Sequence, residues 1–205
     1  VYTAAGDVSE PSAAGKLISQ AVEMLGGLDL LITNSGGPPS GKFETFDDSD
    51  WLTAVDLVFL SHVRLIRAAL PYLRNSDAAS VLTITSMSVK QPISNLVLSN
   101  SIRAATVGLT KSLALELGGD GIRFNSILPG WTQTERVHQL MADRAEINDS
   151  DIDDEFKKQA LESPFERMAT TEEFANPAVF LLSPAASYLT GVMLTVDGGM
   201  IKGIF

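Results

Sequence analysis

Small polar residues and glycines gather in three short segments that each follow an apolar, strand-like run. The segments are Asn34-Ser35-Gly36-Gly37, Thr85-Ser86-Met87-Ser88 and Pro129-Gly130-Trp131-Thr132-Gln133-Thr134. Their hydroxyl and amide groups can hydrogen-bond a ribose or a carboxamide, and their glycines let a flat ligand approach the backbone closely. Any one segment alone is more typical of an ordinary turn. Three in succession at predicted strand ends favour a ligand site.

Nucleophilic and metal chemistry has few candidate residues. The chain has no Cys, and His62 and His138 are its only imidazoles. This composition excludes disulfides, thiol nucleophiles, Cys-ligated zinc and a His-rich metal centre. The acidic run at 149–155 is interpreted as a solvated face, because carboxylates without a compact cluster are poor support for a cation. The sequence therefore predicts no metal site.

The composition describes an apolar but acidic chain. It has 205 residues, of which 45% are hydrophobic, and its formal net charge is −10. This length fits one domain, 1–205, with a substantial core. A negative chain argues against nucleic acid or an anionic membrane surface as a partner. No apolar run approaches the length of a membrane span. We therefore expect a soluble cytoplasmic protein.

Apolar runs alternate with long amphipathic stretches, which is typical of βα units around a parallel sheet. The predicted strands span 28–33, 79–85, 122–128 and 192–196. The predicted helices span 9–25, 47–74, 96–117 and 170–182. Ligands of such sheets bind at the carboxyl ends of the strands, where the three polar segments would meet. Residues 135–165 are polar with weak apolar periodicity, and we expect a mobile excursion that acts as a substrate lid.

On these segments the whole chain resembles the short-chain dehydrogenase/reductase family, close to its β-ketoacyl-carrier-protein-reductase-like members. Gly6-Asp7-Val8-Ser9 is similar to the family's adenine-side acid, and 27–36 is similar to the segment ending in its Asn-Asn-Ala-Gly. Pro129-Gly130 with Thr134 resembles its Pro-Gly-x-x-x-Thr loop, and 188–191 and 196–199 match its carboxyl-terminal pattern. The resemblance implies an α/β fold with a doubly wound, Rossmann-like parallel sheet and a homotetramer or homodimer formed through helices 47–74 and 96–117.

The resemblance also implies NAD or NADP as cofactor. The cofactor-binding positions that it assigns are Asp7, Val8, Asn34, Ser35, Gly36, Arg103, Pro129, Gly130, Thr132 and Thr134. The family's Gly-rich phosphate loop, T-G-x-x-x-G-x-G, does not occur in the sequence. In the family it belongs to the first βα unit, so we expect roughly 50 to 60 residues, or two βα units, before Val1. The choice between NAD and NADP would be made there. The alternative is a chain that does not hold a dinucleotide in the normal way.

The family's catalytic set is changed at three of its four positions. Its substrate-orienting Ser falls on Ser86, but its Tyr falls on Ser99, its Lys on Arg103 and its Asn on Val58. Tyr2, Tyr72 and Tyr188 are the only tyrosines, and none is followed by Lys four residues later. The resemblance therefore implies a degenerate catalytic set.

The replacement has a chemical cost. A Ser hydroxyl is a far weaker acid than a phenol of pKa about 10, and a positioned general acid contributes about 10²- to 10⁴-fold. Arg103 can still hydrogen-bond a ribose and place a positive charge near Ser99. We predict an NAD(P)-linked oxidoreductase that reduces a carbonyl or oxidises a secondary alcohol, with its proton from Ser99, His138 or water. The alternative is a catalytically silent member that binds a ligand or serves as a structural subunit.

Overall fold

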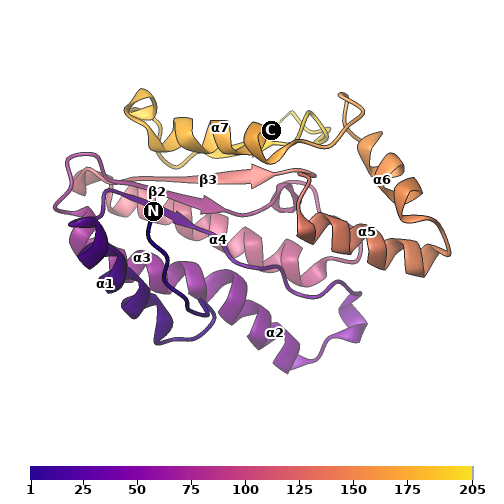
Figure 1. The fold of residues 1–205 in the computed structure, drawn as a ribbon, viewed down its shortest axis with the longest axis horizontal. Coiled ribbons are helices and arrows are strands. Elements are labelled where there is room, and N and C mark those ends of the chain that lie inside the picture. Colours follow the sequence, from indigo (N-terminus) through magenta and orange to yellow (C-terminus); the bar gives the residue numbers. More distant parts are fainter. Residues whose placement is uncertain (205) are drawn as a thin grey trace.

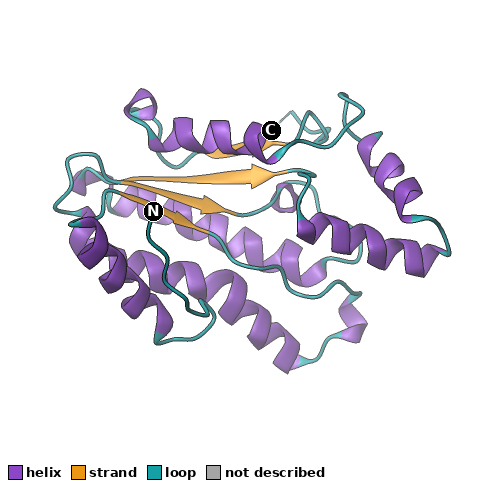
Figure 2. Ribbon diagram, in the orientation of Figure 1, coloured by secondary structure: helices purple, strands orange, loops and turns teal. Residues whose placement is uncertain are grey.

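The computed structural model describes residues 1–204, and its centre is a parallel sheet of four strands in the order β1-β2-β3-β4. Every neighbouring pair is parallel, and Figures 1 and 2 show the sheet between two layers of helices. The strands are β1 (Leu30–Thr33), β2 (Ser80–Ile84), β3 (Arg123–Pro129) and β4 (Met193–Val196). Each lies within one residue of a predicted strand at its carboxyl end, and the predicted α/β class is confirmed.

Helices connect and cover these strands. The α-helices are α1 (Ala13–Leu25), α2 (Asp48–Val55), α3 (Ser61–Leu73), α4 (Val97–Glu116), α5 (Glu135–Asn148), α6 (Ile152–Ala160) and α7 (Thr171–Leu182). Short 3₁₀ turns lie at Phe43–Thr45, Met87–Val89, Gly118–Asp120 and Pro184–Ala186. The predicted start of the first helix at residue 9 is wrong. The side chain of Asp7 instead binds Ser9 in a turn, and α1 begins at Ala13.

The two faces of the sheet carry different cores. Leu31, Val81 and Phe124 are in register and pack with α1, α3 and the end of α4. Residues of the opposite parity, such as Leu82 and Ile127, pack against α7. In Figure 1, α7 accordingly lies above the sheet, and α3 and α4 lie below it. Helices cover both faces, as a doubly wound sheet requires.

The last crossover differs from the first two. The chain passes from β1 to β2 and from β2 to β3 through helices on one face, but it reaches β4 through α7 on the other (Figure 2). The strands keep advancing in one direction, so this crossover has the opposite hand, although almost all such connections share one hand. Because α7 lies over β2 and β3, Leu30 and Ile32 of β1 are 46% and 49% exposed on that face.

The predicted single helix 47–74 consists of three segments. Asp47 begins it with a capping box shared with Asp50, which satisfies free N–H groups at the helix start. A π-helical segment, Asp56–Leu60, then separates α2 from α3. Val58 lies in this segment, is fully buried, and accepts a hydrogen bond through its carbonyl from the Thr106 hydroxyl of α4. A π-turn is rare and is often found at functional sites.

Residues 135–165 form two helices, α5 and α6, where the weak periodicity predicted an irregular excursion. An apolar spacing typical of a helix is nevertheless present over one turn, because Val137, Leu140 and Met141 fall on one side of α5. They pack in what we call the methionine cluster. Its buried members are Met87, Trp131, Val137, Met141, Met168 and Met200. Packing against distant parts of the chain, rather than a strong local pattern, holds α5 in place.

Two features of residues 1–204 concern membranes and metal ions as partners. Within residues 1–204, no helix combines the length and the apolar character that crossing a bilayer requires. In the same residues, His, Asp and Glu side chains form no group of three or more that could hold a metal ion.

Candidate active site

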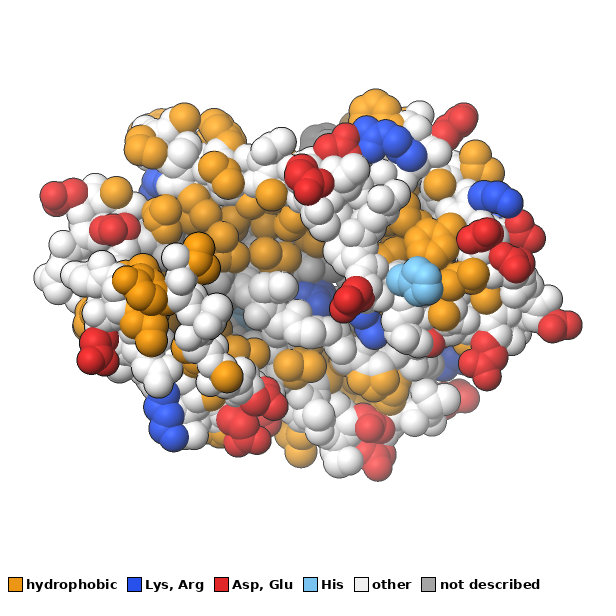
Figure 3. Space-filling model, viewed as in Figure 1, with side chains coloured by type: hydrophobic (Ala, Val, Ile, Leu, Met, Phe, Trp, Pro, Cys, Tyr) orange, Lys and Arg blue, Asp and Glu red, His pale blue; other side chains and the backbone are white. Residues whose placement is uncertain are grey.

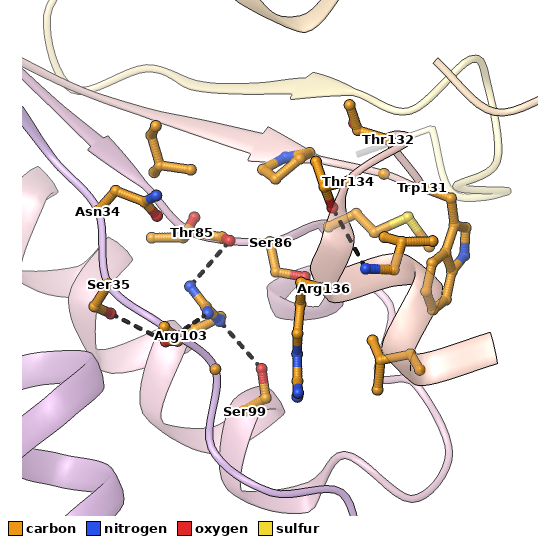
Figure 4. A pocket seen from close by; sticks show the side chains of 18 of the residues that line it. Asn34, Ser35, Thr85, Ser86, Ser99, Arg103, Trp131, Thr132, Thr134 and Arg136 are labelled. Carbon is orange, nitrogen blue, oxygen red and sulfur yellow. Dashed lines mark hydrogen bonds between the residues drawn. The ribbon is translucent and has the colours of Figure 1, made fainter. Parts of the chain in front are cut away.

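A cavity of about 730 Å³ lies at the carboxyl ends of β1, β2 and β3. All three polar segments line it, and Figure 4 shows their side chains converging from separate strands. Parallel strands bring distant loops to one edge of a sheet, and this is where such sheets bind ligands. The predicted site residues that line it are Val8, Asn34, Ser35, Gly36, Ser86, Ser99, Arg103, Pro129, Gly130, Thr132 and Thr134.

Three other candidate residues do not line this cavity. Asp7 uses its Oδ1 atom to accept hydrogen bonds from the Ser9 hydroxyl and backbone N–H, and these bonds lower the pKa of Asp7. His138 stacks at a tilt on Phe156, with ring centroids 5.7 Å apart. His62 is buried under β1. The predicted adenine-side acid and the predicted proton source His138 are therefore not assembled with the other site residues.

Arg103 connects three elements at the base of the cavity. Its Nη1 donates to the carbonyl of Thr85 at 3.1 Å, and its Nη2 donates to the carbonyl of Gly36 at 3.4 Å. Its Nε donates to the hydroxyl of Ser99, one turn earlier on α4, at 3.1 Å (Figure 4). Burial, with a smaller contribution from the positive charge of Arg136, lowers the pKa of Arg103 to about 10. The guanidinium is still charged at neutral pH.

Two hydroxyls flank the cavity near this cation. Ser99 stands beside Arg103, whose positive charge stabilises negative charge developing nearby. Ser86 follows β2, and its Oγ accepts a bond from the backbone N–H of Ser88 at 3.1 Å. That bond fixes the Ser86 side chain and leaves its own hydroxyl proton available for a ligand. The pair can orient a carbonyl oxygen from two sides.

His62 supports the site from beneath. Its Nδ1 lies 2.7 Å from the hydroxyl of Thr33 at the end of β1, and no atom of residues 1–204 pairs with its Nε2. Burial, and to a smaller extent the charge of Arg103, lowers the pKa of His62 to about 4. The imidazole is therefore neutral at pH 7 and fills space under the strand end.

Two buried hydroxyls at the cavity have no hydrogen-bond partner within the described residues. Thr85 Oγ1 and Thr132 Oγ1 are such atoms, and both residues line the cavity. A buried polar group without a partner is costly, and native structures rarely keep one without a reason. Asn34 and Ser35 add an amide and a hydroxyl at the end of β1. This set of small polar donors fits the ribose and carboxamide of a nicotinamide dinucleotide.

The glycine after β3 is a packing requirement. Gly130 donates its N–H to the carbonyl of Val196 at 2.9 Å, and a Cβ at this position would lie 2.7 Å from the Cα of Asp197. A side chain would therefore push the end of β4 away. This close approach explains the Pro129-Gly130 pair at the cavity and fixes the backbone that precedes Thr132 and Thr134.

Sequence reasoning missed Arg136, which lines the cavity from the first turn of α5. Its Nη2 donates to the carbonyl of Pro38 at 3.1 Å, so it reaches from α5 to the loop after β1. One signal was available, because a cation in the first turn of a helix opposes the helix dipole and calls for an explanation. Without the fold, nothing in the sequence links residue 136 to residue 38.

The fold and the cavity together define an open α/β protein that binds its ligand at the carboxyl ends of parallel strands. A family described as enoyl-(acyl carrier protein) reductase matches residues 1–201. The chain therefore belongs to the short-chain dehydrogenase/reductase family of oxidoreductases.

Among similar proteins, the 7alpha-hydroxysteroid dehydrogenase of Escherichia coli is 30% identical over 196 residues, covering 96% of this chain and 72% of that protein. The solved L-sorbose reductase from Gluconobacter frateurii, complexed with NADPH and L-sorbose, has a TM-score of 0.91 at 30% identity. The match covers 98% of this chain and 76% of the reductase chain.

A third similar protein is an NADPH-bound short-chain oxidoreductase from Pseudomonas aeruginosa, described as containing an atypical catalytic center. Its TM-score is 0.87 at 26% identity, over 98% of this chain and 77% of that one.

Proposed function

We propose that the protein is an NAD(P)-dependent oxidoreductase that interconverts a carbonyl and a secondary alcohol, with Ser99 and Arg103 in the positions of the family's Tyr and Lys. The observation that carries this proposal is the convergence of Ser86, Ser99 and Arg103 on one cavity with the loops after β1 and β3. The names of similar proteins, which include dehydrogenases and NADPH-bound reductases, support it.

The residues divide into a cofactor side and a substrate side. Asn34, Ser35 and Gly36 lie at the end of β1, and Arg103 is positioned to donate to a ribose hydroxyl. Thr132 and Thr134 contribute hydroxyls from the loop after β3 toward a carboxamide. The Oγ1 of Thr134 also accepts the N–H of Val137 and so caps α5, which ties the cofactor loop to the helix covering the cavity.

Reduction of a carbonyl needs a hydride at carbon and a proton at oxygen. A reduced nicotinamide, when bound, supplies the hydride, and in the reverse direction the oxidised ring accepts it. Ser86 donates a hydrogen bond to the substrate oxygen and orients it. The proton comes from the Ser99 hydroxyl, which is then replenished by water. Arg103 beside it stabilises the oxyanion that results from this transfer.

The weak acidity of serine sets the expected rate. Arg103 touches Ser99 through Nε, but a guanidinium does not act as a proton donor near neutral pH. We therefore expect turnover to be slower than with a phenol acid by about 10²- to 10⁴-fold. Restoring the acid with the double variant Ser99→Tyr, Arg103→Lys should raise the rate.

Titration of the chain with NADH and NADPH tests the proposal directly. Trp131 lines the cavity, so we expect energy transfer from Trp131 to a bound reduced nicotinamide, lost in Trp131→Phe while calorimetric binding persists. Arg103→Gln should weaken binding, and Arg67→Gln, an exposed charge-matched control on α3, should not. Absence of binding by both cofactors would overturn the proposal.

Turnover separates the remaining alternative. A panel of ketones and secondary alcohols is assayed with the wild type, Ser86→Ala and the double variant. Activity that falls in Ser86→Ala and rises in the double variant supports the proposed roles. Cofactor binding with no turnover by any variant would instead favour a catalytically silent, ligand-binding subunit.

We also propose that α5 and α6 act as the predicted substrate lid. Val137 and Leu140 of α5 line the cavity, while Arg136 reaches across to Pro38. These contacts join the 135–165 segment to the loop after β1 over the site. Hydrogen exchange with and without NADPH tests the lid, and we expect the amides of α5 to become more protected on binding. Unchanged exchange in α5 would contradict it.

The predicted homodimer or homotetramer through helices 47–74 and 96–117 is a further proposal. Leu52 of α2 and Leu115 of α4 are 66% and 77% exposed, and apolar residues on long helices favour a helix–helix interface. Sedimentation of the wild type and of Leu52→Glu, Leu115→Glu tests it. A monomer in the wild type would contradict the proposal.

A further inference from the structure

The cavity is positively charged in a protein that is negatively charged. The chain contains 25 acidic residues and has a formal net charge of −10. Among the residues described as lining the cavity, two are arginines, Arg103 and Arg136, and none is Asp or Glu. Figure 3 shows such basic side-chain atoms (blue) within the hollow at the centre of that view. An uncompensated pair of cations in a recess favours an anionic ligand.

The two arginines are not equivalent. Arg103 is 8% exposed, and its three hydrogen bonds to Ser99, Thr85 and Gly36 hold it in the floor of the cavity. Arg136 donates to Pro38 alone within the described residues. A guanidinium carries five N–H donors in a planar fork that matches a carboxylate. Arg136 therefore keeps more N–H donors for a ligand than Arg103 does.

The position of Arg136 strengthens the local positive potential. It is the second residue of α5, where the helix dipole is positive and an added cation is unfavourable. Its charge also contributes to lowering the pKa of Arg103, so the two guanidinium groups repel one another. Glu135, its neighbour in the chain, does not line the cavity. An anion between these groups would relieve the repulsion.

Several lining residues outside the proposed cofactor positions are apolar. Ile93, Leu96 and Leu140 line the cavity together with Arg136. In Figure 4, Arg136 reaches from α5 down to the level of Ser99, on the same side as the proposed proton donor. A ligand that satisfies this region has an apolar skeleton, an oxygen toward Ser86 and Ser99, and an anionic group toward Arg136.

We propose that Arg136 binds a substrate carboxylate, so that the substrates are oxo acids and the corresponding hydroxy acids. This inference rests on the proposed oxidoreductase function and specifies its substrate class. The reaction balances as an oxo acid, a reduced nicotinamide and a proton giving a hydroxy acid and the oxidised nicotinamide. The carboxylate is unchanged throughout and serves only to hold the carbonyl against Ser86 and Ser99.

Matched acid and ester pairs test the substrate class. The probes are 2-oxo, 3-oxo and 4-oxo acids with an aromatic or branched tail, each compared with its methyl ester under NADPH and NADH. For at least one chain length we expect kcat/KM for the acid to exceed that for the ester by about 10-fold, the value of one charge-assisted hydrogen bond. Arg136→Gln should remove this preference, Arg136→Lys should restore part of it, and Arg67→Gln should preserve it.

A binding measurement keeps the inference independent of turnover. Calorimetry with the oxo acid and its ester, without dinucleotide, should show tighter binding of the acid in the wild type and equal binding in Arg136→Gln. If neither cofactor binds or no carbonyl is reduced, the proposed function fails, and this measurement still decides the role of Arg136.

Two outcomes would overturn the inference. In the first, the wild type reduces or binds acid and ester equally. In the second, Arg136→Gln weakens NADPH binding about 10-fold and lowers turnover of acid and ester alike, which would assign the cation to a cofactor phosphate. Under the proposal, Arg136 does not contact a phosphate of the cofactor. The Kd for NADPH should therefore change by less than about 3-fold in Arg136→Gln.

Discussion

Two arginines occupy opposite ends of the sheet, and they differ in how completely their donors are used. Arg123 begins β3 and donates to five backbone carbonyls, those of Leu181, Leu182, Ser183, Ala186 and Leu189. Arg103, at the carboxyl ends of the strands, contacts two carbonyls and the hydroxyl of Ser99 beside an open cavity. Burial lowers the pKa of both, but only Arg103 faces another cation.

The difference separates a structural cation from a ligand-directed one. Arg123 donates to the last carbonyls of α7, which have no partner within the helix. Its positive charge also interacts favourably with the negative end of the helix dipole. Arg103 receives no comparable compensation, because the charged group that acts on it is Arg136 rather than an acid. The acceptors and charges around Arg123 and Arg103 therefore indicate that the carboxyl end of the sheet binds the ligand.

The largest expected effect is a loss of protein stability when Arg123, at the amino end of β3, is replaced. Arg123→Met should lower the free energy of unfolding by about 3 kcal/mol, because it leaves several carbonyls of α7 and the following turn without a donor. Dinucleotide binding by the folded protein should be unchanged. Urea unfolding and NADPH titration measure both quantities, with Arg67→Met as the exposed control. A loss below about 1 kcal/mol would contradict the structural role.

The same substitution at the carboxyl end should have the opposite profile. Arg103→Met should cost less than about 1 kcal/mol of stability, because water entering the cavity can reach the carbonyls of Thr85 and Gly36. It should weaken NADPH binding by about 30-fold, which corresponds to about 2 kcal/mol for a lost charged hydrogen bond. Equal effects of the two Arg→Met changes on both measurements would remove the distinction.

Local patterns predicted the sheet well. The β-branched run before Thr85 and the apolar run before Asn34 identified strands, because burial on both faces leaves continuous apolar sequence. The same approach failed for 135–165, where α5 is held by Trp131, Met168 and other distant members of the methionine cluster. Periodicity reports local faces, and it cannot report contacts that form only after folding.

The candidate site shows the same limit. Ser86, Ser99 and Arg103 were found because a family resemblance aligned them, and the cavity brings them together. Arg136 was missed because its meaning depends on the loop at Pro38, 98 residues away. Asp7 was assigned from a motif; its Oδ1 accepts hydrogen bonds from Ser9, and Asp7 does not line the cavity. Spacing identifies residues at strand ends, but only the tertiary structure shows which of them share a cavity.

The pH dependence of stability should distinguish the buried His62 from the exposed His138. Burial keeps His62 neutral, with a pKa of about 4 against 6.5 for an ordinary imidazole. Above pH 6.5 neither the folded nor the unfolded state binds this proton, so stability is fully present. Below it the unfolded state takes up the proton first, so stability falls as the pH drops toward 4. At pH 5 the loss should be about 2 kcal/mol.

Unfolding between pH 7 and pH 5 measures this effect. His62→Gln should remove most of the pH dependence in that window, and His138→Gln, at an exposed position of α5, should leave it as in the wild type. This pH window avoids the titration of Glu155 and Glu173. Hydrogen bonds from Lys158 and Arg167 lower their pKa values to about 2. Their contributions to stability are therefore lost only below about pH 4.5. Identical slopes in the wild type and His62→Gln would contradict the assignment.

The smallest expected effect has opposite signs for stability and binding. Thr85 is 4% exposed, and its hydroxyl has no partner within the described residues. Thr85→Val replaces that hydroxyl with a methyl group of similar size, so the free protein should gain about 1 kcal/mol. If the hydroxyl is kept for a ligand, NADPH binding should weaken about 5-fold, the effect of one neutral hydrogen bond.

Thr195 provides the matched control, because its buried hydroxyl on β4 also lacks a partner in the part of the chain that the structure describes, but Thr195 does not line the cavity. Thr195→Val should therefore raise stability by a similar amount and leave NADPH binding unchanged. A gain in stability at both positions with a loss of binding only at Thr85 would show that the carboxyl end of β2 holds an unpaired hydroxyl for its ligand. If Thr85→Val binds NADPH as well as the wild type does, the unpaired hydroxyl serves no cofactor, and the cofactor side of the cavity must be assigned to other residues.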